Sequence, residues 1–458
     1  MHPSSKLSRK ETWRLLALVG AGLAILNTTF QGDGAPLVAS IALCGIVFAV
    51  AFSLIRWLGP VFLKAGLKGK DMAKPSRPEI PETMGAVCAV VYLMSLIMFI
   101  PFAFYKDIVA ATSGGGNRDV VIESQHIENG RFLHRFPHGK LASYLSGLLS
   151  LQSVVILGIG DDLFDIRWRH KVLIPAFSAI PMLIVYFVDF GVTQVVVPMP
   201  LQPYLGDVVD LGWLYYIYMA AVAIFCPNAI NMLAGINGIE VAQSLVIAMQ
   251  LLFNDAMYLA PMTPYPHPAT DSHLLSIYFL LPFIGVSAAL LFHNWYPSKV
   301  FVGDTYCYFA GMVFAVQNLV AAVHSANLQF SVLNPQLFKL IPCPRHRLPK
   351  FSASTGLLDA SVTEWTNPPS PLIDTALRLL RSLRLVRITQ DENGRITESS
   401  NLTILNLWLV WMGPMREDQL AWHMVAVQTV CGMLGLFVRH RLALLVFPHD
   451  NREFGFIV

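Results

Sequence analysis

The stretch NWYPSKVFVGDTYCYFAGMVFAVQNLVAAV, residues 294–323, decides the fold class. From position 302 onward it is apolar and long enough to cross a lipid bilayer, since a spanning helix needs about 20 such residues. Asp304 is the only charged residue in this predicted span. A lone carboxylate at membrane depth is costly unless it meets a cation, which makes Asp304 a candidate metal ligand.

The composition of the whole chain agrees with a membrane protein. Only 13% of the 458 residues are Asp, Glu, Lys or Arg, and 55% are hydrophobic, whereas about 25% are charged in a soluble domain. These values exclude an ordinary cytosolic enzyme, a secreted disulfide scaffold and a disordered protein. The net charge of +3, without basic clusters interleaved with aromatic residues, argues against nucleic-acid binding.

Further apolar runs of similar length predict an all-α polytopic membrane protein. In addition to 302–323, spans are predicted near 36–55, 84–104, 141–160, 172–188, 211–230, 241–260, 274–292 and 422–438. A marginal span within 325–341 would place the basic cluster at 342–350 in the cytosol, unless the gene sequence is truncated there. The expected total is about ten transmembrane helices. Residues 13–30 form either a cleaved signal or an extra helix.

The distribution of Lys and Arg predicts the orientation. The loops at 56–83 and 161–171 are rich in basic residues, whereas those at 189–210 and 261–273 contain none. Basic loops stay in the cytosol, so the first pair is expected there.

Four parts of the chain are therefore expected. They are an N-terminal extension at 1–35, a transmembrane catalytic core at 36–344, a cytosolic loop with a small mixed α/β cap at 345–420, and a last helix with a tail at 421–458. This places the cap between the last two spans. Within it, residues 372–386 have the pattern of an amphipathic helix, and Asn393-Gly394 predicts a hairpin turn. A plain linker with some secondary structure is the alternative.

The few polar residues at membrane depth fall into four clusters at the predicted cytosolic ends of helices. Three carboxylates are followed directly by a run of cations in the first cluster, and Asn and Gly interrupt an apolar run in the second. Asp304 follows Phe301 in the third, and two arginines suited to a diphosphate lie in the fourth. The clusters are GIGDDLFDIRWRHK at 158–171, NAINMLAGINGIE at 228–240, NWYPSKVFVGDTYCYFAG at 294–311 and PCPRHR at 342–347. Together they predict a site where a phosphorylated, water-soluble donor meets a lipid.

These motifs resemble those of the polyprenyl-phosphate N-acetylhexosamine-1-phosphate transferases, and in particular the eukaryotic branch. The resemblance runs from about residue 36 to the C-terminus. It implies transfer of GlcNAc-1-phosphate from UDP-GlcNAc to dolichyl phosphate, releasing UMP and forming GlcNAc-diphosphodolichol. This is the first committed step of N-glycan precursor assembly, in the endoplasmic reticulum membrane with the site facing the cytosol. It also implies Mg2+ as cofactor and a possible homodimer.

The resemblance also implies a role for each matching residue. Asn231 and Asp304 would hold Mg2+, and Lys171 and Asn228 would bind the acceptor. The donor would contact Lys70, Asp71, Met72, Glu82, Asn237, Phe301, Arg345, His346 and Arg347, with Lys74 nearby. The catalytic residues would be Asp161, Asp162 and Lys171. Either aspartate would be a candidate base, although a phosphate monoester with a second pKa near 6 needs little proton removal.

Three other functions remain in competition. A bacterial-type enzyme acting on undecaprenyl phosphate would share most motifs, but the Arg-His-Arg after Pro344 and the insertion at 348–420 favour the eukaryotic type. A nucleotide-sugar transporter would place its polar residues near the bilayer centre, in paired repeats. An intramembrane aspartyl protease would need two facing aspartates within spans.

Overall fold

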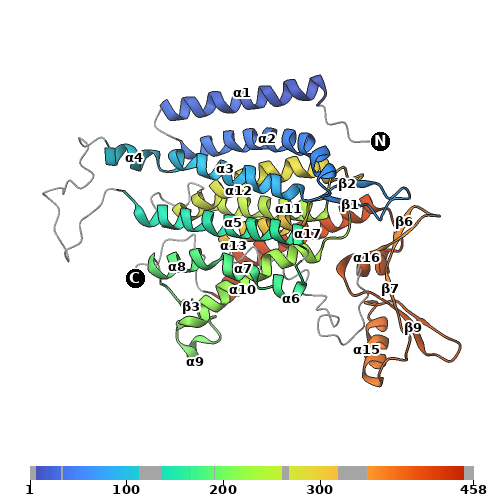
Figure 1. Cartoon of the computed structure of the whole chain (residues 1–458). Coiled ribbons are helices and arrows are strands. Elements are labelled where there is room, and N and C mark those ends of the chain that lie inside the picture. Colours follow the sequence, from blue (N-terminus) through green and yellow to red (C-terminus); the bar gives the residue numbers. More distant parts are fainter. Residues whose placement is uncertain are drawn as a thin grey trace.

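The computed structural model describes residues 7–31, 35–112, 136–164, 166–189, 191–259, 268–317 and 348–447. Long apolar helices lie side by side in a bundle, and a small α/β insertion lies beyond one end of it (Figure 1). Apolar segments adopt helices in a bilayer because a helix satisfies its backbone hydrogen bonds internally. The bundle helices are α1 (Arg9–Gln31), α2 (Pro36–Lys64), α3 (Met84–Ala103), α5 (His138–Phe164), α10 (Trp213–Met232), α11 (Ile239–Leu259), α12 (Pro268–Asn294), α13 (Asp304–Gln317) and α17 (Glu417–His440).

Short elements connect or extend these helices. The connecting elements are β1 (Lys68–Lys70), β2 (Glu79–Pro81), α4 (Tyr105–Thr112), α6 (Trp168–Lys171), α7 (Ile174–Ser178), α8 (Ile180–Asp189), β3 (Gln194–Val196), α9 (Gln202–Leu205), β4 (Val208–Asp210) and a 3-10 helix (Leu442–Leu445). The insertion contains β5 (Lys350–Ser352), β6 (Leu357–Asp359), β7 (Val362–Glu364), α15 (Pro371–Ser382), β8 (Ile388–Gln390), β9 (Ile396–Ser400) and α16 (Ile404–Met412). Three two-stranded antiparallel sheets, β1-β2, β3-β4 and β5-β6, accompany a three-stranded sheet of order β7-β9-β8.

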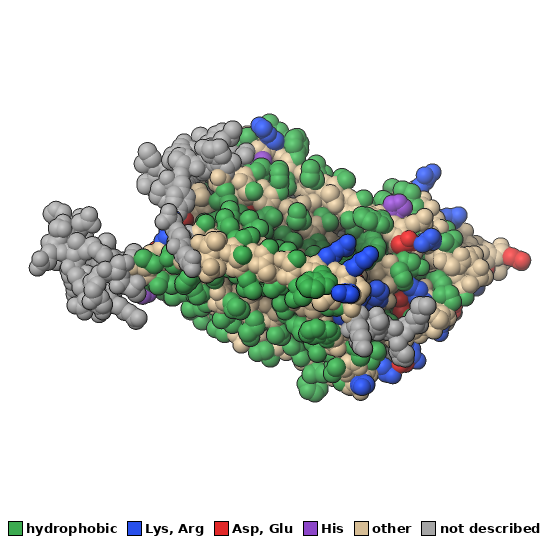
Figure 2. Space-filling view, turned by 90° about the horizontal axis from the view of Figure 1, so that it is seen from above, with side chains coloured by type: hydrophobic (Ala, Val, Ile, Leu, Met, Phe, Trp, Pro, Cys, Tyr) green, Lys and Arg blue, Asp and Glu red, His purple; other side chains and the backbone are tan. Residues whose placement is uncertain are grey.

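The protein is a multi-pass membrane protein. In the described part of the chain, seven helices are long and apolar enough to span a bilayer. Six of them, α2, α3, α5, α10, α12 and α17, coincide with predicted spans. Figure 2 shows hydrophobic side chains over most of the visible bundle, while charged side chains gather mainly toward the end that carries the insertion.

Other predicted spans differ from expectation. The apolar run at 172–188 is not one helix but two, α7 and α8, with Pro181 in the first turn of α8. A proline inside a helix removes a backbone donor and clashes with the preceding turn, which explains the break. Within the described residues α13 extends to Gln317, and the marginal span at 325–341 lies outside them.

The N-terminal segment forms the helix α1, which packs along α2. A Cβ added to Gly22 would lie 2.7 Å from the side chain of Ile46, so the two helices are in direct contact. Arg56 of α2 is 3.3 Å from the Glu11 carboxylate of α1. The structure therefore shows this segment as a helix that packs on α2.

Glycines allow the bundle helices to approach closely around an aromatic core. An added Cβ at Gly85 of α3 would lie 2.4 Å from Tyr306 of α13, and one at Gly311 of α13 would lie 2.3 Å from Pro227 of α10. Small residues at such crossings are typical of membrane helix packing. Because α13 is fixed on both sides, its first residue, Asp304, has a defined position.

The insertion is folded rather than a plain linker. The predicted amphipathic helix is α15, and the predicted hairpin joins β8 to β9 through Gly394, whose φ is +74°. Leu405 and Leu409 of α16 belong to one buried apolar cluster with Leu233 and Ile236, which follow α10. The insertion therefore packs on the loop that joins α10 to α11.

A buried polar cluster ties α11, α12 and α17 together away from the predicted site residues. Asp255 is fully buried; its Oδ1 lies 2.7 Å from Nδ1 of His273, and its Oδ2 accepts a hydrogen bond from the Ser276 hydroxyl at 2.5 Å. The neighbouring Asn254 Oδ1 is 3.0 Å from Nε2 of His440. These contacts cross-link three helices without reaching Lys171 or Asp304.

Replacing Asp255 with alanine is expected to destabilise the protein by about 3 kcal/mol, because removing one member of a buried polar pair leaves its partners unsatisfied. Thermal unfolding in detergent should show a clear drop in melting temperature. Ser276→Ala removes a single hydrogen bond and should cost only about 1 kcal/mol. Equal melting temperatures for the two variants would contradict this interpretation.

Candidate functional site

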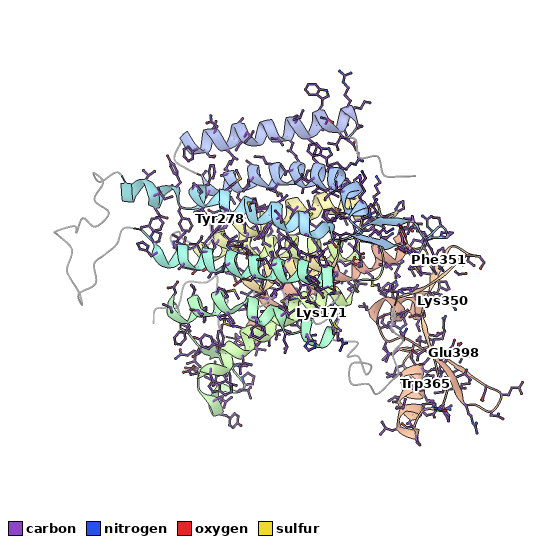
Figure 3. All side chains as sticks on the ribbon, in the orientation of Figure 1. Lys171, Tyr278, Lys350, Phe351, Trp365 and Glu398 are labelled. Atoms are coloured by element: carbon purple, nitrogen blue, oxygen red, sulfur yellow. The ribbon has the colours of Figure 1, made fainter. Side chains whose placement is uncertain are left out.

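Lys171 lies between two carboxylates from different membrane helices. Its Nζ is 2.9 Å from Oδ2 of Asp161, in the last turn of α5, and 2.5 Å from Oδ2 of Asp304, the first residue of α13. Asp161 is buried, and its Oδ1 accepts the Ile166 N–H at 3.0 Å. Lys171 lies toward the insertion end of the bundle (Figure 3). Three residues from two separate motifs thus form one charged centre.

The carboxylates around Lys171 keep its ammonium group protonated. Burial alone would lower the Lys171 pKa, but the hydrogen bonds and charges of Asp304 and Asp161 outweigh it, so the pKa is raised. Negative charges nearby also affect Glu82. Burial raises the pKa of Glu82, and the negative charges of Asp162 and Asp304 raise it further.

Asp162 caps the N-terminus of α13. Its Oδ1 accepts the Asp304 N–H at 2.7 Å, and its Oδ2 accepts the Thr305 hydroxyl at 2.6 Å and the Thr305 N–H at 3.3 Å. A carboxylate at a helix N-terminus satisfies exposed donors and complements the helix dipole. Gly303 leaves room for it, because an added Cβ there would lie 2.5 Å from Asp162 Oδ2. Asp162 therefore fixes the backbone that carries Asp304.

Asp162→Asn is expected to lower kcat about tenfold to a hundredfold and to destabilise the protein by about 1–2 kcal/mol, because the cap loses its charge. Lipid-product assays and thermal unfolding test both effects. Thr305→Val, which removes one hydroxyl, should give a smaller loss of each. Complete inactivity with an unchanged melting temperature would instead indicate direct chemistry by Asp162.

A second polar cluster joins three segments that are distant in sequence. Nζ of Lys74 is 2.6 Å from Oε2 of Glu417 and 3.3 Å from Oδ2 of Asp71. The Asn237 N–H donates to Glu417 Oε1 at 2.7 Å, and its side-chain Nδ2 donates to Asp71 Oδ2 at 3.1 Å. Lys74 also lies 4.2 Å from the ring centroid of Tyr296. Asp71 and Asn237, both predicted donor residues, are thus brought together.

Sequence reasoning missed Glu417. It was assigned to the cytosolic loop at 345–420, whereas α17 begins at Glu417. Acidic residues such as those in Arg416-Glu417-Asp418 are typical of an exposed helix N-terminus. In the structure the Glu417 side chain is only 4% exposed. No local pattern distinguishes it from its neighbour, so this contact could be found only in three dimensions.

The β1-β2 hairpin lies between the charged centre around Lys171 and the polar cluster around Lys74. Phe301 donates its backbone N–H to the Pro81 carbonyl at 2.8 Å. A Cβ added to Gly69 would lie 2.8 Å from the Phe301 ring and 3.1 Å from Oε2 of Glu82. The predicted donor residues Phe301 and Glu82 therefore meet at Gly69, beside the loop that leads into α13.

Asn231 occupies the last turn of α10, on the same side of the bundle as Asp304. The helices α10 and α13 touch where Pro227 meets Gly311, and the Asn228 and Tyr308 contacts to the Lys171–Val172 segment indicate that they run antiparallel. An α-helix rises about 1.5 Å per residue, so along its own helix axis Asn231 lies about 6 Å from the crossing and Asp304 about 10 Å. Both lie in the same direction from it.

The donor atoms in this region suit Mg2+. Carboxylate and amide oxygens are the ligands that this hard cation prefers, and it usually takes one or two carboxylates and completes its shell with water and phosphate oxygens. Among the described residues, no three His, Cys, Asp or Glu side chains converge as a closed metal site. Asn231 and Asp304 carry oxygen donors of this kind.

Other predicted residues have different environments. Asn228 donates its Nδ2 to the Ile224 carbonyl at 2.6 Å and to the Val172 carbonyl at 3.4 Å, so it supports the segment after Lys171. Lys70 lies opposite Glu79 in the β1-β2 register, and Met72 is 53% exposed.

The remaining predicted residues are not described by the structure. The motif Arg345, His346 and Arg347 lies outside the described residues. The predicted contact of these arginines with a diphosphate therefore stays a prediction.

This chain is similar in sequence to known proteins. Residues 144–322 match the family described as glycosyl transferase family 4. A Saccharomyces cerevisiae protein is 47% identical, covering 96% of this chain and 98% of the relative. A Schizosaccharomyces pombe protein is 46% identical over 94% and 97%, and one from Dictyostelium discoideum is 35% identical over 85% and 86%.

All three relatives carry the name UDP-N-acetylglucosamine–dolichyl-phosphate N-acetylglucosaminephosphotransferase. The similarity to the first two relatives spans nearly the full length of this chain. The chain therefore belongs to the family of UDP-N-acetylglucosamine–dolichyl-phosphate N-acetylglucosaminephosphotransferases.

Proposed function

We propose that this chain transfers GlcNAc-1-phosphate from UDP-GlcNAc to dolichyl phosphate, giving GlcNAc-diphosphodolichol and UMP. The observation that carries the proposal is Lys171, held by Asp161 and Asp304 at the end of the membrane helices. This is where a lipid-borne phosphate can meet a water-soluble donor. The family membership of the chain supports the same reaction.

The protein supplies binding and orientation for an in-line displacement. An oxygen of the acceptor phosphate forms a bond to the phosphorus that bears GlcNAc, and the bond from that phosphorus to the bridging oxygen breaks, so that UMP leaves. The Lys171 ammonium binds and orients the acceptor phosphate. Because that phosphate is largely dianionic at neutral pH, the attacking oxygen needs no strong base.

Asp161 and Asp162 act as positioning residues in this proposal. Both oxygens of each carboxylate accept hydrogen bonds from the protein. Asp161 holds Lys171, and Asp162 holds the first turn of α13. Proton abstraction by either would require these contacts to break first.

Asn231 and Asp304 would hold Mg2+. The bound ion would neutralise negative charge on the donor diphosphate as the phosphoryl group transfers. Asp71, Asn237, Phe301 and the hairpin residues would bind the nucleotide portion. Arg345, His346 and Arg347 keep their predicted role at the diphosphate and sugar.

The proposed setting is the endoplasmic reticulum membrane, with the insertion end of the bundle in the cytosol. The basic loops at 56–83 and 161–171 support this orientation by the positive-inside rule. The proposed topology has about ten spans, with the insertion between the last two, and the proposed assembly is a homodimer. Protease protection of the insertion in sealed microsomes would contradict the orientation.

The reaction can be tested with purified protein, radiolabelled UDP-GlcNAc, dolichyl phosphate and Mg2+, followed by extraction of the lipid. Labelled lipid and stoichiometric UMP are expected. Absence of labelled lipid would contradict the proposed function. Uptake of intact UDP-GlcNAc into sealed vesicles, without chemistry, would favour the transporter alternative.

A further inference from the structure

Glu417 lies apart from Lys171 yet joins two segments that carry donor-site residues. Its Oε2 binds the Lys74 ammonium at 2.6 Å, and its Oε1 accepts the Asn237 N–H at 2.7 Å. One carboxylate thus fixes a side chain from the loop after α2 and the backbone of the loop after α10. Glu417 itself belongs to α17, which follows the insertion in the chain.

We propose that Glu417 is a positioning residue that sets the affinity for the nucleotide of the donor. This inference rests on the proposed function, because it assumes that Asp71 and Asn237 face UDP-GlcNAc. Glu417 holds the Asn237 backbone, while Asp71 receives the Asn237 side-chain N–H at 3.1 Å. Together they fix both the position of this residue and the orientation of its amide.

A fixed amide is chemically suited to a uracil base. A side-chain amide offers a carbonyl acceptor and N–H donors on opposite edges, and uracil offers a ring N–H and two carbonyls. Because one N–H of Asn237 is already committed to Asp71, the amide cannot flip without losing that bond. Preorganised polar groups bind a ligand more tightly because less ordering remains to be done on binding.

The loop that carries Asn237 needs external support. Gly235 has a φ of +153° and Gly238 a φ of +83°, and a Cβ added to Gly238 would lie 2.8 Å from the Trp295 ring. On its apolar side, Ile236 packs in the cluster that includes Leu405 of the insertion. Glu417 supplies the polar contact, so the insertion and α17 together hold this loop.

The contacts also predict which substrate is affected. Glu417 binds Lys74 and Asn237, whereas Lys171 binds Asp161 and Asp304. Loss of Glu417 should therefore weaken donor binding while acceptor binding and the chemical step are retained. A role limited to folding would lower the amount of folded enzyme without changing KM.

The test compares Glu417→Gln with Asp418→Asn in the full-length enzyme. Asp418 is the adjacent carboxylate, and it pairs with Arg416 at the surface. In Glu417→Gln, the KM for UDP-GlcNAc and the inhibition constant of UMP should both rise about tenfold, as loss of a hydrogen bond to a charged group predicts. The kcat and the KM for dolichyl phosphate should stay within about threefold, and Asp418→Asn should resemble the wild type.

Two further variants keep the test decisive if Glu417→Gln folds poorly. Lys74→Gln should show the same donor-specific change, and its combination with Glu417→Gln should be less than additive, because the two residues share one ion pair. Glu417→Asp retains the charge and should recover part of the UMP affinity. Unchanged donor KM and UMP inhibition in these variants would overturn the inference, whereas a wild-type enzyme without lipid product would overturn the proposed function itself.

Discussion

Asp304→Asn is expected to lower kcat about a thousandfold, which corresponds to about 4 kcal/mol of transition-state stabilisation. The variant keeps the size of the side chain but removes the negative charge that Lys171 and the proposed Mg2+ share. Folding should be preserved, because Asp162 caps α13 through the Asp304 backbone N–H rather than through its side chain. Initial rates of labelled lipid formation, together with thermal unfolding, measure both quantities.

The chain contains a matched control for this variant. Asp271 also lies in the first turn of a membrane helix, and its Oδ2 is 2.6 Å from Nζ of Lys140. That pair is more exposed to solvent, and exposed pairs contribute little to stability. Asp271→Asn should therefore keep activity within about twofold, since it removes a similar carboxylate–lysine contact that lies outside the proposed site.

Chelation of divalent cations provides an independent arm of the same experiment. The wild-type enzyme should lose turnover in excess chelator and recover it when Mg2+ is restored. Asp304→Asn should require a higher Mg2+ concentration for its residual activity, because one of two proposed protein ligands has lost its charge. An unchanged Mg2+ dependence would place the metal elsewhere.

Part of this site was predictable because an ionisable side chain at membrane depth is energetically costly. Asp304 stands out because a single carboxylate in an apolar run needs compensation. Asp161 and Lys171 stand out for the same reason at the end of the α5 segment. Composition and span length also indicate most of the bundle, because a bilayer permits few alternatives to a helix.

Contacts between distant segments were not predictable in the same way. Asp162 has the same local sequence signal as Asp161, yet it caps a different helix, α13. Glu417 has the local sequence signal of an ordinary helix start, yet it is buried against Lys74. Both roles depend on how the helices pack. A single sequence does not show which distant segments come into contact.

Lys171→Met is expected to reduce kcat/KM for dolichyl phosphate at least about a thousandfold, because the partly buried cation proposed to bind the acceptor phosphate is replaced by an apolar side chain. Lys171→Arg keeps the charge but presents a planar fork instead of a compact ammonium. It should retain partial activity, at about one hundredth of the wild-type value. Acceptor titrations at saturating UDP-GlcNAc separate these outcomes.

The pH dependence follows from the raised pKa of Lys171. A raised pKa means that the protonated form is favoured in the folded protein, so its contribution to stability is complete below the unfolded-state pKa. That contribution is lost only as the pH rises through the still higher folded-state pKa. Wild-type activity should therefore show no loss from Lys171 deprotonation between pH 7 and about pH 9.

A structural role and a phosphate-binding role for Lys171 can be separated with one additional variant. Lys171→Met leaves the Asp161 and Asp304 carboxylates without their shared cation, so the protein should also be destabilised. Adding Asp161→Asn removes one of these charges and should restore much of the melting temperature. Activity should stay low in the double variant, because the acceptor phosphate still lacks its cation. Recovery of turnover along with stability would show instead that Lys171 only holds α5 and α13 together.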